Sequence, residues 1–227
     1  MKALKYAAAP GLLLLAACGP GDRAPGENAA QPASATASNE VKQTPSASRT
    51  DLACDYPVDG TMDTAASVLA RFGKQARRAT IAGPEGMELA GVVLWPGDPV
   101  REVELILDDE RPGEHIAGLR VSGEKSQWQA QGLGIGAPLE RVVAANGAAI
   151  GFWGFGWDYG GYVSDLGKGR LEQLPGGCSL GLRLDLAADD PQQGEGLMGD
   201  SAVRSDDKAA AGRRIFVDEI SLNWRQK

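Results

Sequence analysis

The chain has 227 residues, with 23 basic and 30 acidic side chains and a formal net charge of −7. This length is enough for one folded domain with additional sequence beside it. The acidic balance argues against a nucleic-acid-binding protein and against a polybasic patch for anionic lipids.

The N-terminal segment has the pattern of a bacterial secretion signal. Lys2 and Lys5 precede an apolar run over residues 7–17, which is too short to cross about 30 Å of hydrocarbon as a helix. The run closes with Leu15-Ala16-Ala17-Cys18, which resembles the lipobox of bacterial lipoproteins. This resemblance implies cleavage before Cys18 and attachment of fatty acyl chains to its sulfur and its new amino group. The alternative is an ordinary cleaved signal in which the cysteine has no role.

The lipobox resemblance divides the chain into three parts. Residues 1–17 are the predicted signal peptide, residues 18–50 the lipidated N-terminus with a disordered tether, and residues 51–227 a single periplasmic domain. The tether is rich in Ala, Pro, Ser, Gly and Thr, and such a segment cannot bury enough apolar surface to fold. Without the signal and its two lysines, 21 basic and 30 acidic side chains leave a net charge of −9. Gly19 stands where the enteric rule has an inner-membrane aspartate, so the expected location is the outer membrane, facing the periplasm.

The first predicted element after the tether is a short helix over residues 64–72. Asp63 is its expected N-cap, Gly73 follows its end, and apolar residues at intervals of three and four form one stripe. Strands are expected next, because apolar and β-branched residues cluster or alternate between turn signals. They are predicted over residues 89–94, 103–107 and 116–121, with a further strand around Trp128.

A second helix is predicted over residues 138–145, with Pro138 at its first position and Asn146-Gly147 as its stop. Later strands are predicted over residues 149–155, 161–164, 179–186 and 215–224, with a bulge near Asp218-Glu219 and a long polar loop over 187–212. Aligning Gly73 with Gly147 superposes the apolar stripes of the two helices. The predicted fold class is therefore α+β, an antiparallel sheet with two short helices arranged as two tandem helix-plus-strands units.

Two cysteines remain once Cys18 is assigned to lipid. Cys54 and Cys178 are predicted to form a disulfide, because a pair in an oxidising periplasm is more often bonded than free. The bridge would close a loop of about 125 residues and contribute roughly 4–5 kcal/mol on the chain-entropy model. The alternative is two unpaired thiols, one of them buried as a small apolar side chain.

Aromatic residues and glycines are interleaved over residues 151–161, which contain five of the chain's thirteen aromatic residues. A further aromatic residue, Tyr162, follows directly. One interpretation is a binding surface on which flat rings stack on sugars or clamp a peptide, with a carboxylate as polar contact. The candidate binding residues are Trp153, Trp157, Asp158, Tyr159 and Tyr162. The other interpretation is a sharply bent hairpin whose aromatics fill the core and whose Asp158 caps the turn.

Residue patterns for catalysis are sparse. His115 is the one histidine, no Gly-x-Ser-x-Gly motif occurs, and one histidine with a bonded cysteine pair does not make a zinc site. No catalytic residue, metal or cofactor is therefore predicted. The function expected is non-enzymatic binding of an envelope protein or polymer. The alternative is a small envelope glycan hydrolase in which Asp158 and a second carboxylate such as Asp165 act as acid and base.

Several motifs resemble a family of uncharacterised bacterial secreted lipoproteins. They are Arg71-Phe72-Gly73, Val93-Leu94-Trp95-Pro96, the run from Gly134-Ile135-Gly136 to Asn146-Gly147, and Gly154-Phe155-Gly156-Trp157-Asp158-Tyr159-Gly160-Gly161. The family carries no assigned activity. More loosely, a helix that ends in glycine and leads into a small antiparallel sheet is similar to the β-lactamase-inhibitor-protein fold and to the small lipoprotein of the outer-membrane β-barrel assembly machinery. The resemblance implies only that binding proteins are the class to consider first.

Overall fold

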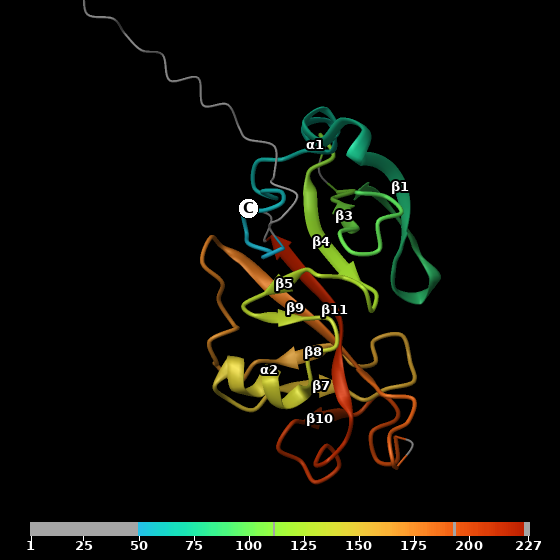
Figure 1. Cartoon of the computed structure of the whole chain (residues 1–227), viewed down its shortest axis with the longest axis vertical. Helices are drawn as coiled ribbons and strands as arrows, with labels where there is room; N and C mark the ends of the chain where they lie inside the picture. The colour runs from blue at the N-terminus through green and yellow to red at the C-terminus, as the bar shows by residue number, and fades with distance from the viewer. Residues whose placement is uncertain (1–49, 111, 193, 225–227) are drawn as a thin grey trace, which may run out of the picture. The chain divides into compact units, whose positions relative to one another are not determined.

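The computed structural model describes residues 50–110, 112–192 and 194–224 (Figure 1). The predicted signal peptide, Cys18 and the tether up to residue 49 lie outside the described residues. In the described part, no helix has the length and apolar character needed to span a membrane.

A six-stranded antiparallel sheet forms the centre of the fold. Its strands are, in spatial order, β1 (Ala76–Ala82), β2 (Glu88–Leu94), β3 (Val103–Leu107), β4 (Ile116–Ser122), β11 (Ile215–Trp224) and β9 (Cys178–Leu186). A three-stranded sheet has the order β10 (Ala202–Arg204), β7 (Gly151–Trp153) and β8 (Val163–Asp165), and β5 (Gln129–Ala130) pairs with β6 (Leu133–Gly134). The helices are α1 (Ala65–Phe72) and α2 (Leu139–Asn146), with 3-10 turns η1 (Gly73–Gln75) and η2 (Pro84–Gly86). The fold is dominated by antiparallel sheet and contains two helices, which agrees with the predicted α+β class.

Helix α1 begins one residue later than predicted, and its N-cap is Thr64 rather than Asp63. The Thr64 hydroxyl accepts a hydrogen bond from the Ser67 amide at 3.3 Å, and the Ser67 hydroxyl accepts one from the Thr64 amide at 3.0 Å. This reciprocal pair is a capping box. The Asp63 carboxylate is buried instead against Arg71, with nitrogen–oxygen distances of 2.9 and 2.8 Å. The predicted cap was wrong because Arg71 holds this carboxylate.

Helix α2 begins at Leu139, so Pro138 is its N-cap and not its first helical residue. It ends as predicted at Gly147, which is left-handed and donates its amide hydrogen bond to Val143 O at 2.8 Å. Two of the three aligned pairs, Ala65 with Leu139 and Val68 with Val142, are buried in both helices, and the third, Leu69 with Val143, is partly buried in both. The strands differ, because those after α1 pair in one sheet whereas those after α2 divide between two sheets.

The predicted bulge in the last strand is confirmed. The pairing of β11 with β9 shifts register between Val217 and Glu219, which leaves Asp218 as the extra residue. This shift changes the parity of the strand, so that Val217 before it and Ile220 after it are both fully buried. Three strands were missed, namely β1 as a whole, the two-residue β6, and β10 inside the segment predicted as a loop.

The disulfide between Cys54 and Cys178 is present, with a Cα–Cα distance of 5.4 Å. It joins the segment before α1 to the first residue of β9. The indole of Trp224, at the end of β11, donates to Cys54 O at 3.0 Å. The start of the folded region is therefore bound both covalently and by a hydrogen bond to neighbouring strands of the large sheet.

Candidate functional site

Charged side chains form a ladder across the middle of the large sheet. Glu104 on β3 pairs in register with Arg120 on β4, and Glu219 on β11 pairs in register with Arg183 on β9. These residues alternate with buried apolar neighbours, so they lie on the face opposite the apolar core. The Arg120 Nε donates to a Glu104 carboxylate oxygen at 2.7 Å and lies 3.8 Å from a Glu219 oxygen.

The β1–β2 hairpin reaches this charged ladder through its tip. Arg120 donates a second hydrogen bond to the carbonyl oxygen of Ala82, the last residue of β1, at 3.0 Å. The turn that follows carries Glu85 in a left-handed conformation, with φ 54°. Arg120 therefore connects the hairpin tip to the middle of the sheet.

The loop between β7 and β8 contains the predicted aromatic–glycine segment and is held against β9. The amide of Leu184 donates to Gly161 O at 2.8 Å, and the Arg183 Nε donates to Gly160 O at 3.0 Å. Gly161 has φ +79°, and a Cβ at this position would overlap the carbonyl oxygen of Leu184. Only glycine allows the loop to approach β9 so closely.

The aromatic side chains of the segment divide between core and surface. Phe152 and Phe155 are 0% and 5% exposed, so for these two rings the core interpretation was correct. Trp153 and Trp157 are partly exposed, and their rings pack edge to face at 6.2 Å. Tyr159 is 38% exposed, and its ring lies 5.4 Å from that of Trp157.

Tyr162 and Trp157 each have a fixed polar partner. The guanidinium of Arg183 lies over the Tyr162 ring, 5.1 Å from its centroid, and the Tyr162 hydroxyl donates to Glu219 at 3.5 Å. The Trp157 indole donates to Gly154 O at 2.8 Å. These contacts hold the two side chains in place without any ligand.

Two hollows adjoin the aromatic loop, one beside the hairpin tip and one beside β9 and β11, and Trp157 and Arg183 border both of them. The first, of about 290 Å³, is lined by residues 82–86 of the hairpin and by Arg120, Trp157, Asp158, Tyr162 and Arg183. The second, of about 400 Å³, is lined by Phe155, Gly156, Trp157, Gly160, Arg183, Leu184, Asp185 and Asp218. Together the two hollows form the groove.

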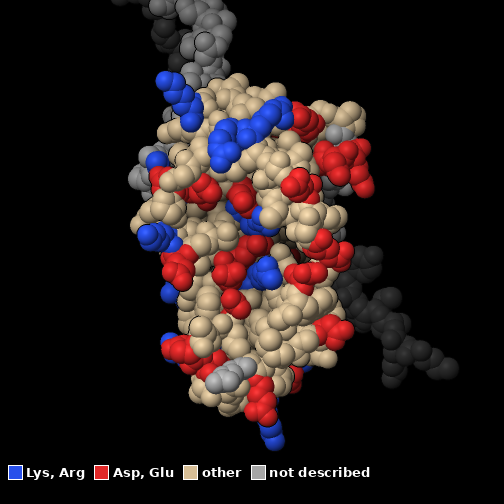
Figure 2. Space-filling model, turned by 90° about the vertical axis from the view of Figure 1, so that its right-hand side faces the viewer, with Lys and Arg blue, Asp and Glu red and all other residues tan. Residues whose placement is uncertain are grey.

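Both the hairpin tip and the aromatic loop project to the right in Figure 1, and this side of the molecule faces the viewer in Figure 2. Figure 2 shows acidic groups gathered around isolated basic groups in the middle of this side. The groove is therefore set in a predominantly acidic surface.

Burial and mutual repulsion alter the titration of the acidic groups around the groove. Burial raises the pKa of Glu219; the charges of Arg120 and Arg183 oppose this effect, and those of Asp218 and Glu104 add to it. Burial likewise raises the pKa of Asp218, and the charge of Asp185 raises it further. The Glu85 carboxylate, which accepts a hydrogen bond from the Tyr159 hydroxyl at 3.2 Å, raises the pKa of that phenol.

The two carboxylates expected to act together lie in different surroundings. Asp158 is exposed and lines the first hollow, where Glu85 is the other carboxylate. Asp165 does not line either hollow; it accepts a hydrogen bond from the Gly167 amide at 2.7 Å and lies 3.8 Å from Arg204. The groove therefore brings Asp158 together with Glu85 and not with Asp165.

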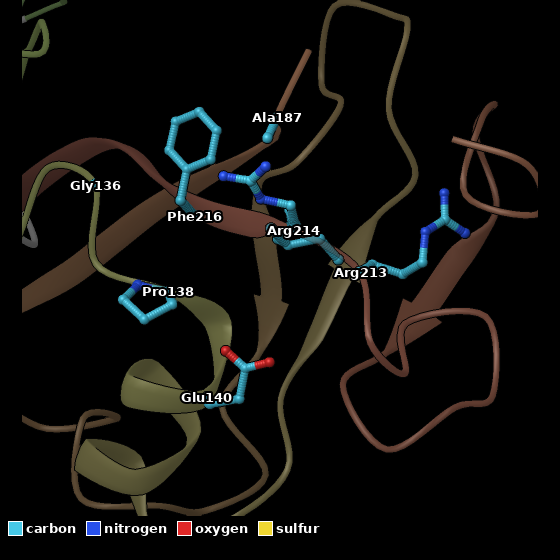
Figure 3. A pocket seen from close by; sticks show the side chains of 8 residues that line it. Gly136, Pro138, Glu140, Ala187, Arg213, Arg214 and Phe216 are labelled. Carbon is cyan, nitrogen blue, oxygen red and sulfur yellow. The ribbon is translucent and has the colours of Figure 1, made fainter. Parts of the chain in front are cut away.

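A separate pocket of about 480 Å³ lies between the start of α2 and the start of β11 (Figure 3). Pro138, Glu140 and Phe216 line it, and Figure 3 shows the Arg214 guanidinium on the same side as the Phe216 ring. Arg214 is paired with the carboxylate of Asp189. This pocket contains none of the residues predicted from the sequence as binding residues.

Sequence reasoning missed Arg120, Arg183 and Glu219, which form the floor of the groove or lie directly beneath it. The signal was present as single charges between apolar residues, as in Leu182-Arg183-Leu184. Such alternation indicates a polar face but does not show what covers it. Within the described residues, no three or more His, Cys, Asp or Glu side chains are grouped so that they could hold a metal ion.

No protein-family model, no curated protein and no solved structure matches this chain.

Proposed function

We propose that the protein is a lipid-anchored, non-enzymatic binding protein of the bacterial envelope that holds an envelope protein or polymer in the groove. The observation that carries the proposal is an accessible aromatic ring in a concave charged site: Trp157 lines both hollows, and the exposed Tyr159 ring packs beside it and bonds to Glu85. Binding sites typically combine aromatic walls with a few polar groups that orient the ligand. The proposed anchor rests on the resemblance of Leu15-Ala16-Ala17-Cys18 to a lipobox, and Gly19 after it favours the outer membrane, facing the periplasm.

Preorganisation of the groove supports binding as its role. Arg120 and Arg183 are held by backbone carbonyls, and the Trp157 indole is held by Gly154. Side chains that are already fixed lose less conformational entropy when a partner binds, so more of the contact energy appears as affinity. The long N-terminal tether would let the domain reach partners at a distance from the membrane.

Capture from detergent-solubilised envelopes tests the groove. We expect the full-length wild-type chain to retain a specific protein or glycan and the Trp157→Ala/Tyr159→Ala variant to lose it. Met62→Ala is the matched control, because Met62 is 71% exposed and does not line the groove. Equal capture by the wild type and the double variant would contradict the proposal, provided that both show the same thermal unfolding.

The anchor has its own test. We expect Cys18→Ala to abolish incorporation of radiolabelled palmitate and to move the chain from the detergent phase to the aqueous phase. Several acyl chains hold a protein on a membrane far more firmly than one chain, so the change should be close to complete. Unchanged partitioning of the variant would remove the basis for a lipid anchor.

A small glycan hydrolase is the second candidate, and the observation that favours it is the presence of Glu85 and Asp158 in the same hollow. Paired carboxylates are the usual acid and base of glycoside cleavage. Incubating the full-length chain with peptidoglycan or a chitin oligosaccharide should release new reducing ends if this candidate is correct. Asp158→Asn should then abolish the release, whereas absence of any release by the wild type rules against hydrolysis of these glycans.

A further inference from the structure

We infer that the groove binds a cationic segment of a partner protein, and this inference rests on the proposed binding function. Lysine or arginine side chains of that segment lie against the Trp157 and Tyr159 rings, beside the carboxylates of Glu85 and Asp158.

The groove and the ladder beneath it carry a clear excess of negative charge. Two guanidinium groups, Arg120 and Arg183, face six carboxylates, so that the net charge is −4 with all groups ionised; the carboxylates are Glu85, Glu104, Asp158, Asp185, Asp218 and Glu219. Protonation of the two whose pKa burial raises, Asp218 and Glu219, would still leave −2. A low-dielectric concave site with this charge attracts cations and repels anions.

The two cations of the groove are already engaged. Arg120 is bound to Glu104 and to the carbonyl of Ala82 and lies near Glu219, while Arg183 is bound to Gly160 O and stacked on a tyrosine ring. An anionic ligand would have to compete with these contacts. The arginines therefore organise the groove and do not mark it as an anion site.

Two carboxylates at the mouth of the groove are available to a partner. Among the described residues, Glu85 accepts one hydrogen bond from Tyr159 and makes no salt bridge, and Asp158 makes no salt bridge either. Both side chains are exposed. Like charges in one hollow repel each other, and an incoming ammonium or guanidinium group would relieve this repulsion.

The rings at the mouth suit the same kind of ligand. Trp157 and Tyr159 lie tilted at 59° to each other, with centroids 5.4 Å apart, and present two aromatic surfaces beside Glu85 and Asp158. A cation within about 6 Å of such a ring is attracted by its quadrupole. The charges of Glu85 and Asp158 also raise the pKa of the Tyr159 phenol, which places this ring in a negative potential.

The rim of the groove favours a polypeptide as the source of the cation. Met87, next to the hairpin turn, is 53% exposed, and Met198 is 56% exposed. The Met198 methyl lies 2.6 Å from the position that a Cβ on Gly156 would take, so it borders the second hollow. Unbranched thioethers adapt to irregular apolar surfaces, such as the aliphatic stems of lysine and arginine and the side chains between them. An acidic envelope polysaccharide would meet the repulsive charge of the groove.

Titration with charged peptides of equal length tests the inference. Fluorescein-labelled hexalysine or hexaglutamate is added to the full-length chain in micelles of an uncharged detergent, and binding is followed by anisotropy. We expect hexalysine to bind, with an affinity that falls as salt is added, and hexaglutamate not to bind. Glu85→Gln/Asp158→Asn should weaken hexalysine binding by about tenfold or more.

A second pair of substitutions separates local from global charge. Glu124→Gln/Glu172→Gln removes the same charge from exposed positions that do not line the groove, and should change the affinity by less than about twofold. Equal weakening by both pairs, or equal binding of the two peptides, would overturn the inference. Tighter binding of hexa-N-acetylglucosamine than of hexalysine would overturn it in favour of a glycan site.

Failure of the inference and failure of the proposed function give different results. If envelope capture is lost in Trp157→Ala/Tyr159→Ala but is unaffected in Glu85→Gln/Asp158→Asn, the groove binds a partner that is not recognised by its positive charge. Such a result overturns the inference alone. If no form of the chain captures a partner or binds any of the three probes, both the inference and the proposed binding function fail.

Discussion

Replacing both Cys54 and Cys178 with alanine should lower the free energy of unfolding by roughly 5 kcal/mol. The bridge joins residues 124 positions apart and therefore constrains a large part of the unfolded chain. On the chain-entropy relation, a loop of this length corresponds to about 16 cal/mol/K, or roughly 5 kcal/mol at 25 °C. Small proteins are stable by only about 5–15 kcal/mol, so the loss should bring this one close to its unfolding threshold.

Urea unfolding in the Cys18→Ala background measures the effect, because that background contains no other cysteine. The buried indoles of Trp128 and Trp224 report unfolding by fluorescence. The dependence of the unfolding free energy on urea should also steepen, because an unbridged unfolded chain exposes more surface. Each single Cys→Ala variant should lose nearly as much stability as the double variant, since either one removes the same bridge. Additive single effects, or an unchanged midpoint on addition of reductant to the bridged chain, would refute the reasoning.

Three further substitutions test the packing and electrostatics of the described residues. Gly161→Ala should destabilise the protein by more than about 2 kcal/mol, because the added Cβ clashes with the backbone and alanine disfavours the left-handed conformation. Gly97→Ala is the control: Gly97 has φ +80° and open space around it, so only the conformational penalty of about 1–2 kcal/mol is expected. Asp190→Asn should lower the melting temperature most at neutral pH. The reason is that Arg213 lowers the pKa of Asp190, so the ionised carboxylate stabilises the fold, and this stability is lost only as the pH falls below 3.8, the ordinary pKa of an aspartate. A difference in melting temperature that does not shrink between pH 7 and pH 2 would contradict this. Glu219→Gln should show the opposite pH dependence. Burial raises the pKa of Glu219, so the wild type loses stability as the pH rises through this raised pKa. The melting temperature of the variant relative to that of the wild type should therefore increase between pH 4.5 and pH 7.

Local sequence patterns predicted the helices well, because short-range chemistry controls them. The apolar stripe and the closing glycine placed α2 within one residue, and Gly147 adopts the left-handed conformation expected of it. The bulge at Asp218 was also predictable, because apolar residues changed parity on either side of it. The cap of α1 was not, because the pairing of Asp63 with Arg71 is a contact between the segment before the helix and its last turn.

Strand β1 shows where local pattern fails. It lies at the edge of the large sheet and exposes both Arg77 and Arg78, so that its sequence lacks the apolar alternation of a half-buried strand. Pairing with β2 along seven residues stabilises it, and this pairing depends on the neighbouring strand rather than on its own side chains. Strand β10 has only three residues, and it too forms by pairing with a neighbouring strand, β7.

By itself the sequence determined the positions of the two helices, the pairing of its two domain cysteines and the unusual character of the aromatic–glycine segment. These features depend on neighbours within a few residues, or on there being only one partner available. Only the tertiary structure decided that Phe152 lies in the core while Trp157 and Asp158 border a groove, and that Glu85 rather than Asp165 accompanies Asp158. The physical reason is that the groove is built by strand register and by a hairpin tip and a loop more than seventy residues apart in the chain, which no local pattern encodes.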